Sequence, residues 1–236
     1  MSAQPFYLKK SRKPVARFLG GIILMLVAAP FLDEYEYGLE IDAMLITAVL
    51  VLGLLAVSRS RRTFLIGVAL LLPAIITRWL FHFQPHWLPV PMPNISALIF
   101  MVFVEWQLLR FIFRARHVDS EVLCAGIAGY LLLGVLWMSA YLLVSRLNPI
   151  DATHLGAFAF NVNSAVAHPL SQFEAYYFSF ITLSTVGYGD ITPLSHGART
   201  LAMLEAMTGT LYLAVLISRL VSLHSTHSPP PAEGQD

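Results

Sequence analysis

Charged residues are scarce in this sequence. Asp, Glu, Lys and Arg make up 12% of its 236 residues, whereas a soluble domain carries roughly 25%. Much of the protein surface must therefore face something other than water. The formal net charge of +1 is too small for a basic surface that binds nucleic acid through its phosphates, so we expect no nucleic-acid partner.

Features that support catalysis or cross-linking are also missing. Cys124 is the single cysteine, so an intrachain disulfide is impossible, and its apolar neighbours fit a small packing residue. The eight histidines are scattered and form no dense cluster of metal ligands. The sequence offers neither paired catalytic carboxylates nor a nucleophile beside a base. We therefore expect a protein that is not an enzyme and holds no cofactor.

Long hydrophobic runs are abundant. The residues are 57% hydrophobic, and the mean hydropathy is +0.68. Six segments approach the length of about 20 apolar residues that a helix needs to cross a bilayer, which predicts an all-α membrane protein with six transmembrane helices. The segments are residues 15–32, 41–57, 64–83, 95–113, 122–147 and 198–223.

Basic loops alternate with loops that lack Lys and Arg. The basic segments are 1–17, 59–62 and 114–117, and the others are 33–40, 82–94 and 148–172. Basic loops remain in the cytoplasm. The pattern predicts a multi-pass protein of the cell (plasma or inner) membrane, in contact with membrane lipids, with both termini in the cytoplasm. A basic segment before a hydrophobic run is also typical of a signal peptide, but Pro30 to Glu34 form no small-residue cleavage site, so we expect a retained helix.

One apolar stretch is too short to span the membrane and is followed by glycines. It covers residues 176–184, and Gly187 and Gly189 come just after it. Glycine tolerates positive φ, so alternate peptide units can turn and point successive carbonyl oxygens in one direction. Irregular backbone at membrane depth is tolerated only where protein buries it or where it lines a water-filled path. We therefore expect a re-entrant loop between the fifth and sixth helices, opening to the outside.

Residues 176–193, YYFSFITLSTVGYGDITP, resemble the filter region of the tetrameric potassium channels, whose TVGYG segment replaces the hydration shell of K⁺ by carbonyl oxygens. The two-transmembrane pore module of that superfamily (the ion channel 2 type) is the most similar part, over residues 122–223. The resemblance implies an outer helix, a pore helix at residues 173–184, and an inner helix. One such loop cannot encircle an ion, so we expect a homotetramer.

The resemblance also divides the chain into parts. Residues 18–117 would form a four-helix transmembrane domain and residues 118–223 the pore domain. Residues 1–17 would be a cytoplasmic N-terminus. Residues 224–236 are proline-rich without apolar periodicity, which is typical of a disordered tail.

The ion sites follow from the same resemblance. They would be formed by backbone carbonyl groups, with K⁺ as the bound and permeant ion. The Thr185 hydroxyl would contribute to one site, and the ring of Tyr188 would hold the diameter of the filter. The filter residues are Thr185, Val186, Gly187, Tyr188 and Gly189.

Residues around the filter would support it. Asp190 would guard the outer mouth, and Ser184 would end the pore helix, whose negative dipole end then faces the cation. Many relatives have two tryptophans where this chain has Tyr177 and Phe178. Phe178 has no hydrogen-bond donor, and Ile181 offers Asp190 no carboxyl partner. We hypothesise a filter held by fewer hydrogen bonds and more prone to collapse.

Two residues of the sixth helix are gating candidates by resemblance. Gly209 lies at mid-helix, where relatives often have a hinge, and close helix packing is the alternative explanation. Glu205, about one turn earlier, matches an acidic residue of relatives. We expect it to bond behind the filter rather than face the ions.

The fourth helix is a weak candidate for a voltage sensor. A sensor needs several Arg or Lys residues spaced along a helix so that charge moves through the field. This helix has Arg110 and Arg114 at its inner end, with Arg116 just beyond, which is typical of cytoplasmic anchors. We expect weak or no intrinsic voltage sensing.

Glu105 lies about halfway along the same helix, where an ionisable group is costly and faces a partner or water. We expect Arg78 of the third helix as its partner, with Gln107 nearby. A structural ion pair is our interpretation, and a proton or ligand sensor is the alternative.

The sequence thus predicts a potassium-selective channel that conducts K⁺ passively. One alternative is a weakly selective cation channel, although Tyr188 argues against it. Another is a potassium transporter subunit, although such relatives carry four pore loops per chain. The gating stimulus stays open, because the sequence contains no visible cytoplasmic ligand domain.

Overall fold

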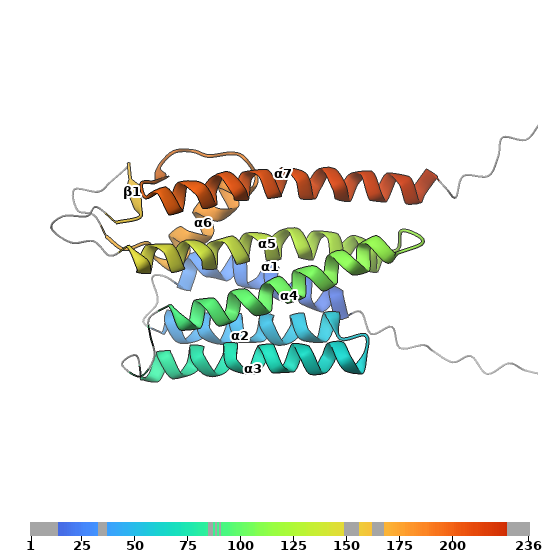
Figure 1. Ribbon diagram of the computed structural model, residues 1–236, viewed down its shortest axis with the longest axis horizontal. Coiled ribbons are helices and arrows are strands. Elements are labelled where there is room, and N and C mark those ends of the chain that lie inside the picture. Colours follow the sequence, from blue (N-terminus) through green and yellow to red (C-terminus); the bar gives the residue numbers. More distant parts are fainter. Residues whose placement is uncertain are drawn as a thin grey trace, which may run out of the picture.

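The computed structural model describes residues 14–32, 37–84, 87, 89, 91–148, 156–161 and 168–225. Within these residues the chain forms a helical bundle with one short two-stranded antiparallel sheet (Figure 1). The elements are α1 (Pro14–Leu32), α2 (Gly38–Val57), α3 (Arg61–Phe83), α4 (Met92–Arg114), α5 (Ser120–Leu147), β1 (Phe158–Phe160), α6 (Gln172–Leu183), β2 (Ile191–Pro193) and α7 (His196–Ser225).

Six of these helices, all except α6, are long and apolar enough to cross a membrane. This confirms the predicted all-α fold with six transmembrane helices. The C-terminal ends of α1, α2, α3 and α5 fall on the predicted residues. The predictions for residues 1–13, for the acidic residues 33–36 and for residues 226–236 of the tail lie outside the described part of the chain.

Polar side chains set the beginnings of three helices. Ser60 accepts a hydrogen bond from the Thr63 amide at 3.1 Å at the start of α3, and Asp119 accepts one from the Val122 amide at 2.8 Å at the start of α5. At the start of α6, Ser171 forms a capping box with Glu174. Because such caps satisfy amides that have no partner within the helix, they fix where each helix begins.

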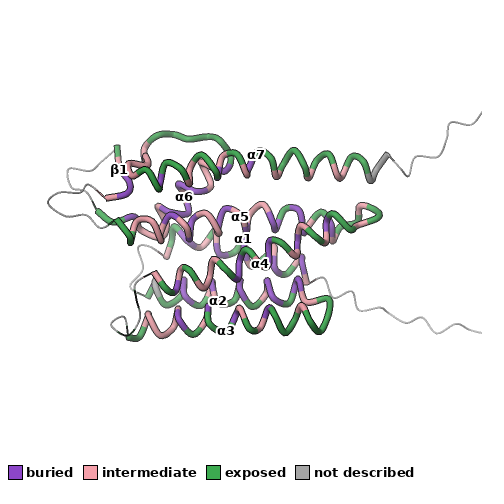
Figure 2. The backbone as a smooth tube through the Cα atoms, in the orientation of Figure 1, coloured by how far each residue is buried: buried purple, intermediate pink, exposed green. Residues whose placement is uncertain are grey.

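The core lies in the middle of the bundle, around the three central helices α1, α4 and α5, with buried side chains of α2 packed against them (Figure 2). α7 and α3 occupy opposite edges of the molecule, and α7 is exposed along most of its length. Large side chains from the three central helices are almost completely buried, among them Phe18, Ile22, Phe100, Leu108 and Leu132.

Small residues on α5 let its neighbours approach closely. A Cβ at Gly134 would lie 2.6 Å from the ring of Phe180 on α6, and a Cβ at Gly129 would lie 2.3 Å from the hydroxyl of Tyr212 on α7. Glycine at these positions removes the side chain that would keep the helices apart. α5 therefore carries both the short helix α6 and the long helix α7, and it positions the loop between them.

Candidate functional site

The segment from Thr185 to Gly189 has an alternating backbone. Thr185, Gly187 and Gly189 have φ values of 60°, 52° and 81°, whereas no positive φ occurs at Val186 or Tyr188. Glycine adopts such values without strain, but a threonine held there costs on the order of 1–3 kcal/mol. The alternation turns successive peptide units, as the glycine spacing in the sequence predicts.

The amides of this segment bond back to α6. The Val186 and Gly187 amides both donate to the Ile181 carbonyl, at 2.8 and 3.2 Å, and the Thr185 amide donates to the Thr182 carbonyl at 2.9 Å. Within the described ranges, the carbonyl oxygens of residues 185–188 accept no hydrogen bond. These carbonyl oxygens are therefore left available to another partner, and α6 ends at Leu183 with Ser184 as its C-cap.

The segment lies on the outer edge of the molecule. Val186 is 52% exposed and Tyr188 is 73% exposed, and the loop after α6 arches over α7 on the side away from the bundle (Figures 1 and 2). A single chain therefore leaves this segment exposed at its edge and does not enclose a path with it.

Asp190 is held at the C-terminal end of the segment. The Tyr177 hydroxyl donates to its carboxylate at 2.7 Å, and the Ile191 amide donates to the other carboxylate oxygen at 3.0 Å. The hydrogen bond from Tyr177 holds the pKa of Asp190 below its ordinary value. Asp190 thus obtains a donor from Tyr177 although Ile181 offers no carboxyl group.

Asn161, to which no sequence pattern points, also holds this end. Its side-chain amide donates to the Gly189 carbonyl at 2.6 Å, and its backbone amide donates to the Asp190 carbonyl at 2.7 Å. Asn161 follows β1, which pairs antiparallel with β2 directly after Asp190. A three-residue strand in a long loop carries too weak a pattern for this contact to be predicted.

Phe178 is buried between α5 and β1. Its ring makes edge-to-face contacts with Tyr141 on α5 and Phe158 on β1, with centroids 4.9 and 5.3 Å away. Such aromatic pairs add about 0.5–1.5 kcal/mol beyond the burial of their area. Within one chain Phe178 therefore fixes α6 against α5, and its predicted effect on the filter stays a prediction.

Glu205 of α7 is fully buried behind α6. The Ser179 hydroxyl of α6 lies 2.5 Å from one carboxyl oxygen and 2.8 Å from the Gly134 carbonyl. The Tyr141 hydroxyl of α5 bonds to the other carboxyl oxygen. The carboxyl group therefore joins α5, α6 and α7. Ser179 and Tyr141 were not singled out in the sequence, because only the rotation of each helix brings them to Glu205.

Gly209 packs against the end of α6. A Cβ at this position would lie 2.4 Å from the carbonyl oxygen of Leu183 and 2.9 Å from the Leu183 side chain. The contact with backbone supports the close-packing role of Gly209. α7 continues through this position as one helix.

The predicted pair between Glu105 and Arg78 is wrong. Arg78 lies 3.0 Å from Asp42 of α2, and Gln172 at the start of α6 donates to the same Asp42 oxygen at 2.5 Å. Glu105 faces the opposite way, toward Gly129 of α5 and a cavity of about 310 Å³ that α4, α5 and α7 line. Both its carboxyl oxygens are buried without a hydrogen-bond partner among the described residues.

Comparisons with known proteins agree on the C-terminal part of the chain. Residues 150–225 match the family model described as "Ion channel". Two-pore potassium channel 4 of Arabidopsis thaliana is 45% identical over 21% of this chain and 17% of its own length. The inward rectifier potassium channel Kirbac3.1 of Paramagnetospirillum magnetotacticum is 46% identical over 22% of this chain and 18% of its own length.

A shorter relative, Protein LctB of Geobacillus stearothermophilus, is 43% identical over 25% of this chain and 44% of its own length. The chain thus spans less than half the length of each of these relatives, and no solved structure matches it. The six apolar helices and the family match define a multi-pass membrane protein with an ion-channel domain. Over this region the chain is similar to proteins of the potassium channel superfamily.

Proposed function

We propose that the protein is a potassium-selective channel that conducts K⁺ passively as a homotetramer. The observation that carries the proposal is the alternating backbone at Thr185, Gly187 and Gly189, with the carbonyls of residues 185–188 accepting no hydrogen bond within the described part of the chain. The names of the relatives, which describe potassium channels, support the choice of ion.

The mechanism is compensated dehydration. K⁺ gives up its water shell because the carbonyls of Thr185, Val186, Gly187 and Tyr188, with the Thr185 hydroxyl, take the place of water oxygens. Several adjacent sites, each binding weakly, let ions repel one another onward. The C-terminal end of α6, at Ser184, adds a partial negative charge that favours a cation.

Four copies of the chain complete the pathway. One copy presents its carbonyl row on an open edge, with Val186 and Tyr188 largely exposed, so symmetric copies are needed to close a ring around the ion. In this arrangement residues 118–223 form the pore domain and α7 lines the path. Residues 18–117 form a peripheral domain.

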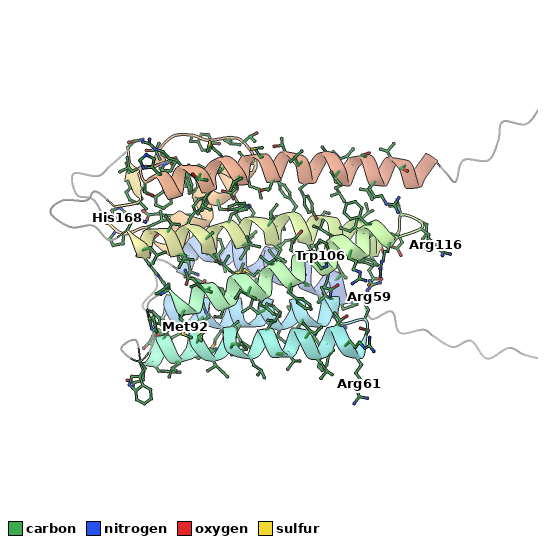
Figure 3. All side chains as sticks on the ribbon, viewed as in Figure 1. Arg59, Arg61, Met92, Trp106, Arg116 and His168 are labelled. Carbon is green, nitrogen blue, oxygen red and sulfur yellow. The ribbon has the colours of Figure 1, made fainter. Side chains whose placement is uncertain are left out.

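The charge pattern supports an orientation. Arg59, Arg61 and Arg116 lie at the end of the bundle opposite to Met92 and His168 (Figure 3), and basic ends face the cytoplasm. Asp190 then faces the outside, and both termini are cytoplasmic. Arg110 and Arg114 lie in the last turns of α4, so little charge lies within the membrane field, and we expect no steep voltage dependence.

Reversal potentials of the purified protein in a planar bilayer test the proposal. Under opposed K⁺ and Na⁺ gradients, the potential is expected to follow the K⁺ gradient. A potential that follows Na⁺, or a protein of tetrameric size that passes no current, would contradict it. A potential between the two would indicate the weakly selective cation channel instead.

A further inference from the structure

A cavity of about 440 Å³ opens at the basic end of the bundle, away from the filter. It lies between the beginning of α1, the connection from α2 to α3, and the last turns of α4. Its polar wall consists of Arg59, Ser60, Thr63, Gln107, Arg110 and Arg114.

Positive charge dominates this cavity. Three guanidinium groups line it, from Arg59, Arg110 and Arg114, and no carboxylate is among the lining residues. Arg110 and Arg114 are one turn apart on α4, so their like charges repel. Among the described residues, neither of the two makes a hydrogen bond or an ion pair.

Arg59 is held in place over the cavity. Its guanidinium group stacks at 3.6 Å from the ring centroid of Phe111 on α4, and it pairs with Glu121 at 3.4 Å. Both members of that pair are substantially exposed, at 51% and 35%, so the carboxylate neutralises Arg59 only weakly. The beginning of α3 adds the partial positive charge of a helix N-terminus.

The opposite wall is apolar. Val15, Val57 and Leu108 are buried and line the cavity together with Ala56 and Phe111. A site with basic side chains on one wall and apolar side chains on the other suits a molecule with an anionic headgroup and a hydrocarbon chain. Residues 9–13, which directly precede α1, are basic in sequence. Because the arginines of the cavity carry the same sign of charge, these residues are an unsuitable occupant of the cavity.

We propose that this cavity binds the anionic headgroup of a phospholipid from the cytoplasmic leaflet. The leaflet assignment rests on the orientation given under the proposed function. The phosphate contacts Arg110 and Arg114, the Ser60 and Thr63 hydroxyls supply neutral donors, and the first part of an acyl chain follows the apolar wall.

The lipid would act on α7 through the end of α4. Arg219 of α7 donates to the carbonyls of Phe113 and Ala115, at 3.0 and 2.8 Å. Arg114 lies between Phe113 and Ala115, whose carbonyls accept these hydrogen bonds. A headgroup bound at Arg114 therefore contacts the same turn to which α7 is attached. Through this contact the lipid regulates the inner helix, although it binds far from the filter.

Lipid retention by the full chain tests the site independently of conduction. The purified protein is titrated with phosphatidylglycerol or phosphatidylcholine of the same chain length and observed by native mass spectrometry. The wild type is expected to retain phosphatidylglycerol in preference. The variant R110Q/R114Q is expected to bind it about 30-fold more weakly, because each basic side chain near an anionic headgroup contributes roughly a factor of five.

The matched control is R61Q/R116Q, which removes the same charge from the same end of the bundle. Arg61 and Arg116 extend away from the helices (Figure 3) and are not among the cavity residues. Retention by this control is expected to stay within about twofold of wild type, since neither side chain lines the cavity and salt screens exposed charges. If R110Q/R114Q does not assemble, the single variant Arg114→Gln is tested instead. It is expected to bind phosphatidylglycerol about fivefold more weakly than the wild type.

Three results would overturn the proposal: equal losses in both double variants, equal retention of both lipids by the wild type, or displacement of the lipid by glycerol phosphate at a similar concentration. The last result would assign the cavity to a soluble anion. In vesicles, phosphatidylglycerol is expected to change Rb⁺ efflux of the wild type but not of R110Q/R114Q. If no lipid supports efflux while retention persists, the channel proposal fails and the lipid site stands.

Discussion

At the scale of single residues, backbone conformation sets the requirements of the segment from Thr185 to Gly189 more than side-chain packing does. A Cβ placed on Gly187 or Gly189 would meet nothing within 4 Å in the single chain, yet both residues have positive φ. Glycine is therefore required there for its conformational freedom and not for space. Thr185 has the same sign of φ without being glycine, so the segment carries some strain.

We predict that Gly187→Ala disrupts conduction or selectivity while the protein still assembles. An alanine at a φ of 52° costs about 1 kcal/mol, enough to shift the peptide units that present the carbonyls. Reversal potentials of the reconstituted variant measure the effect. The control is Gly20→Ala in α1, where a Cβ also meets nothing within 4 Å and φ is not positive. Equal behaviour of the two variants would contradict the prediction.

We predict that acid weakens the outer mouth through Asp190. Its folded-state pKa is lowered by the bond from Tyr177, so this support is fully present at neutral pH. It is lost as pH falls through the lowered pKa. Tyr177→Phe removes the donor, raises the pKa of Asp190 and moves the loss to higher pH.

The measurement is the dependence of slow inactivation on external pH, in wild type and in Tyr177→Phe. Tyr37→Phe is the control, because Tyr37 is exposed, precedes α2 and makes no capping hydrogen bond. An unchanged pH midpoint in Tyr177→Phe would show that this bond does not set the titration of Asp190.

At the scale of elements, the short helix α6 is fixed from several sides. Its beginning is capped by Ser171, its middle bonds to Glu205 through Ser179, and its end packs against Gly209. Since the amides of residues 185–187 bond directly to Ile181 and Thr182 in its last turn, any displacement of α6 is transmitted to this segment.

We predict that Gly209→Ala displaces α6 and destabilises the protein by about 1–3 kcal/mol, the usual cost of overpacking. The added methyl group meets backbone, the Leu183 carbonyl at 2.4 Å, which cannot rotate away. Melting temperature and single-channel conductance are the readouts. Gly197→Ala in the same helix is the control, since its nearest neighbour would be 3.9 Å away. A variant that only changes opening, at wild-type stability, would favour the hinge instead.

At the scale of the whole molecule, polar contacts connect α2, α3 and α4 with α6 and α7. Asp42 of α2 is only 8% exposed and binds both Arg78 of α3 and Gln172 of α6. At the opposite end of the bundle, Arg219 ties α7 to the end of α4. The first four helices therefore contact α6 and α7 at both ends of the bundle.

We predict that Arg78→Leu lowers stability by about 1–3 kcal/mol, because it leaves a largely buried carboxylate short of a partner. The pair has side-chain exposures of 25% and 12%. Thermal unfolding in detergent measures the change. Arg59→Leu, which breaks the more exposed pair with Glu121, is expected to cost less than about 1 kcal/mol. A larger loss in Arg59→Leu than in Arg78→Leu would reverse this ranking.

The sequence by itself determined the features that depend on neighbours in the chain. The lengths of the hydrophobic runs defined six membrane helices, and the glycine spacing after a short apolar stretch indicated a turned backbone, because both follow from local geometry. Only the tertiary structure decided the partners of the buried polar groups. Arg78 binds Asp42 instead of Glu105, and Asn161 reaches Gly189. Such contacts depend on the rotation of each helix and on loop closure, which periodicity does not encode.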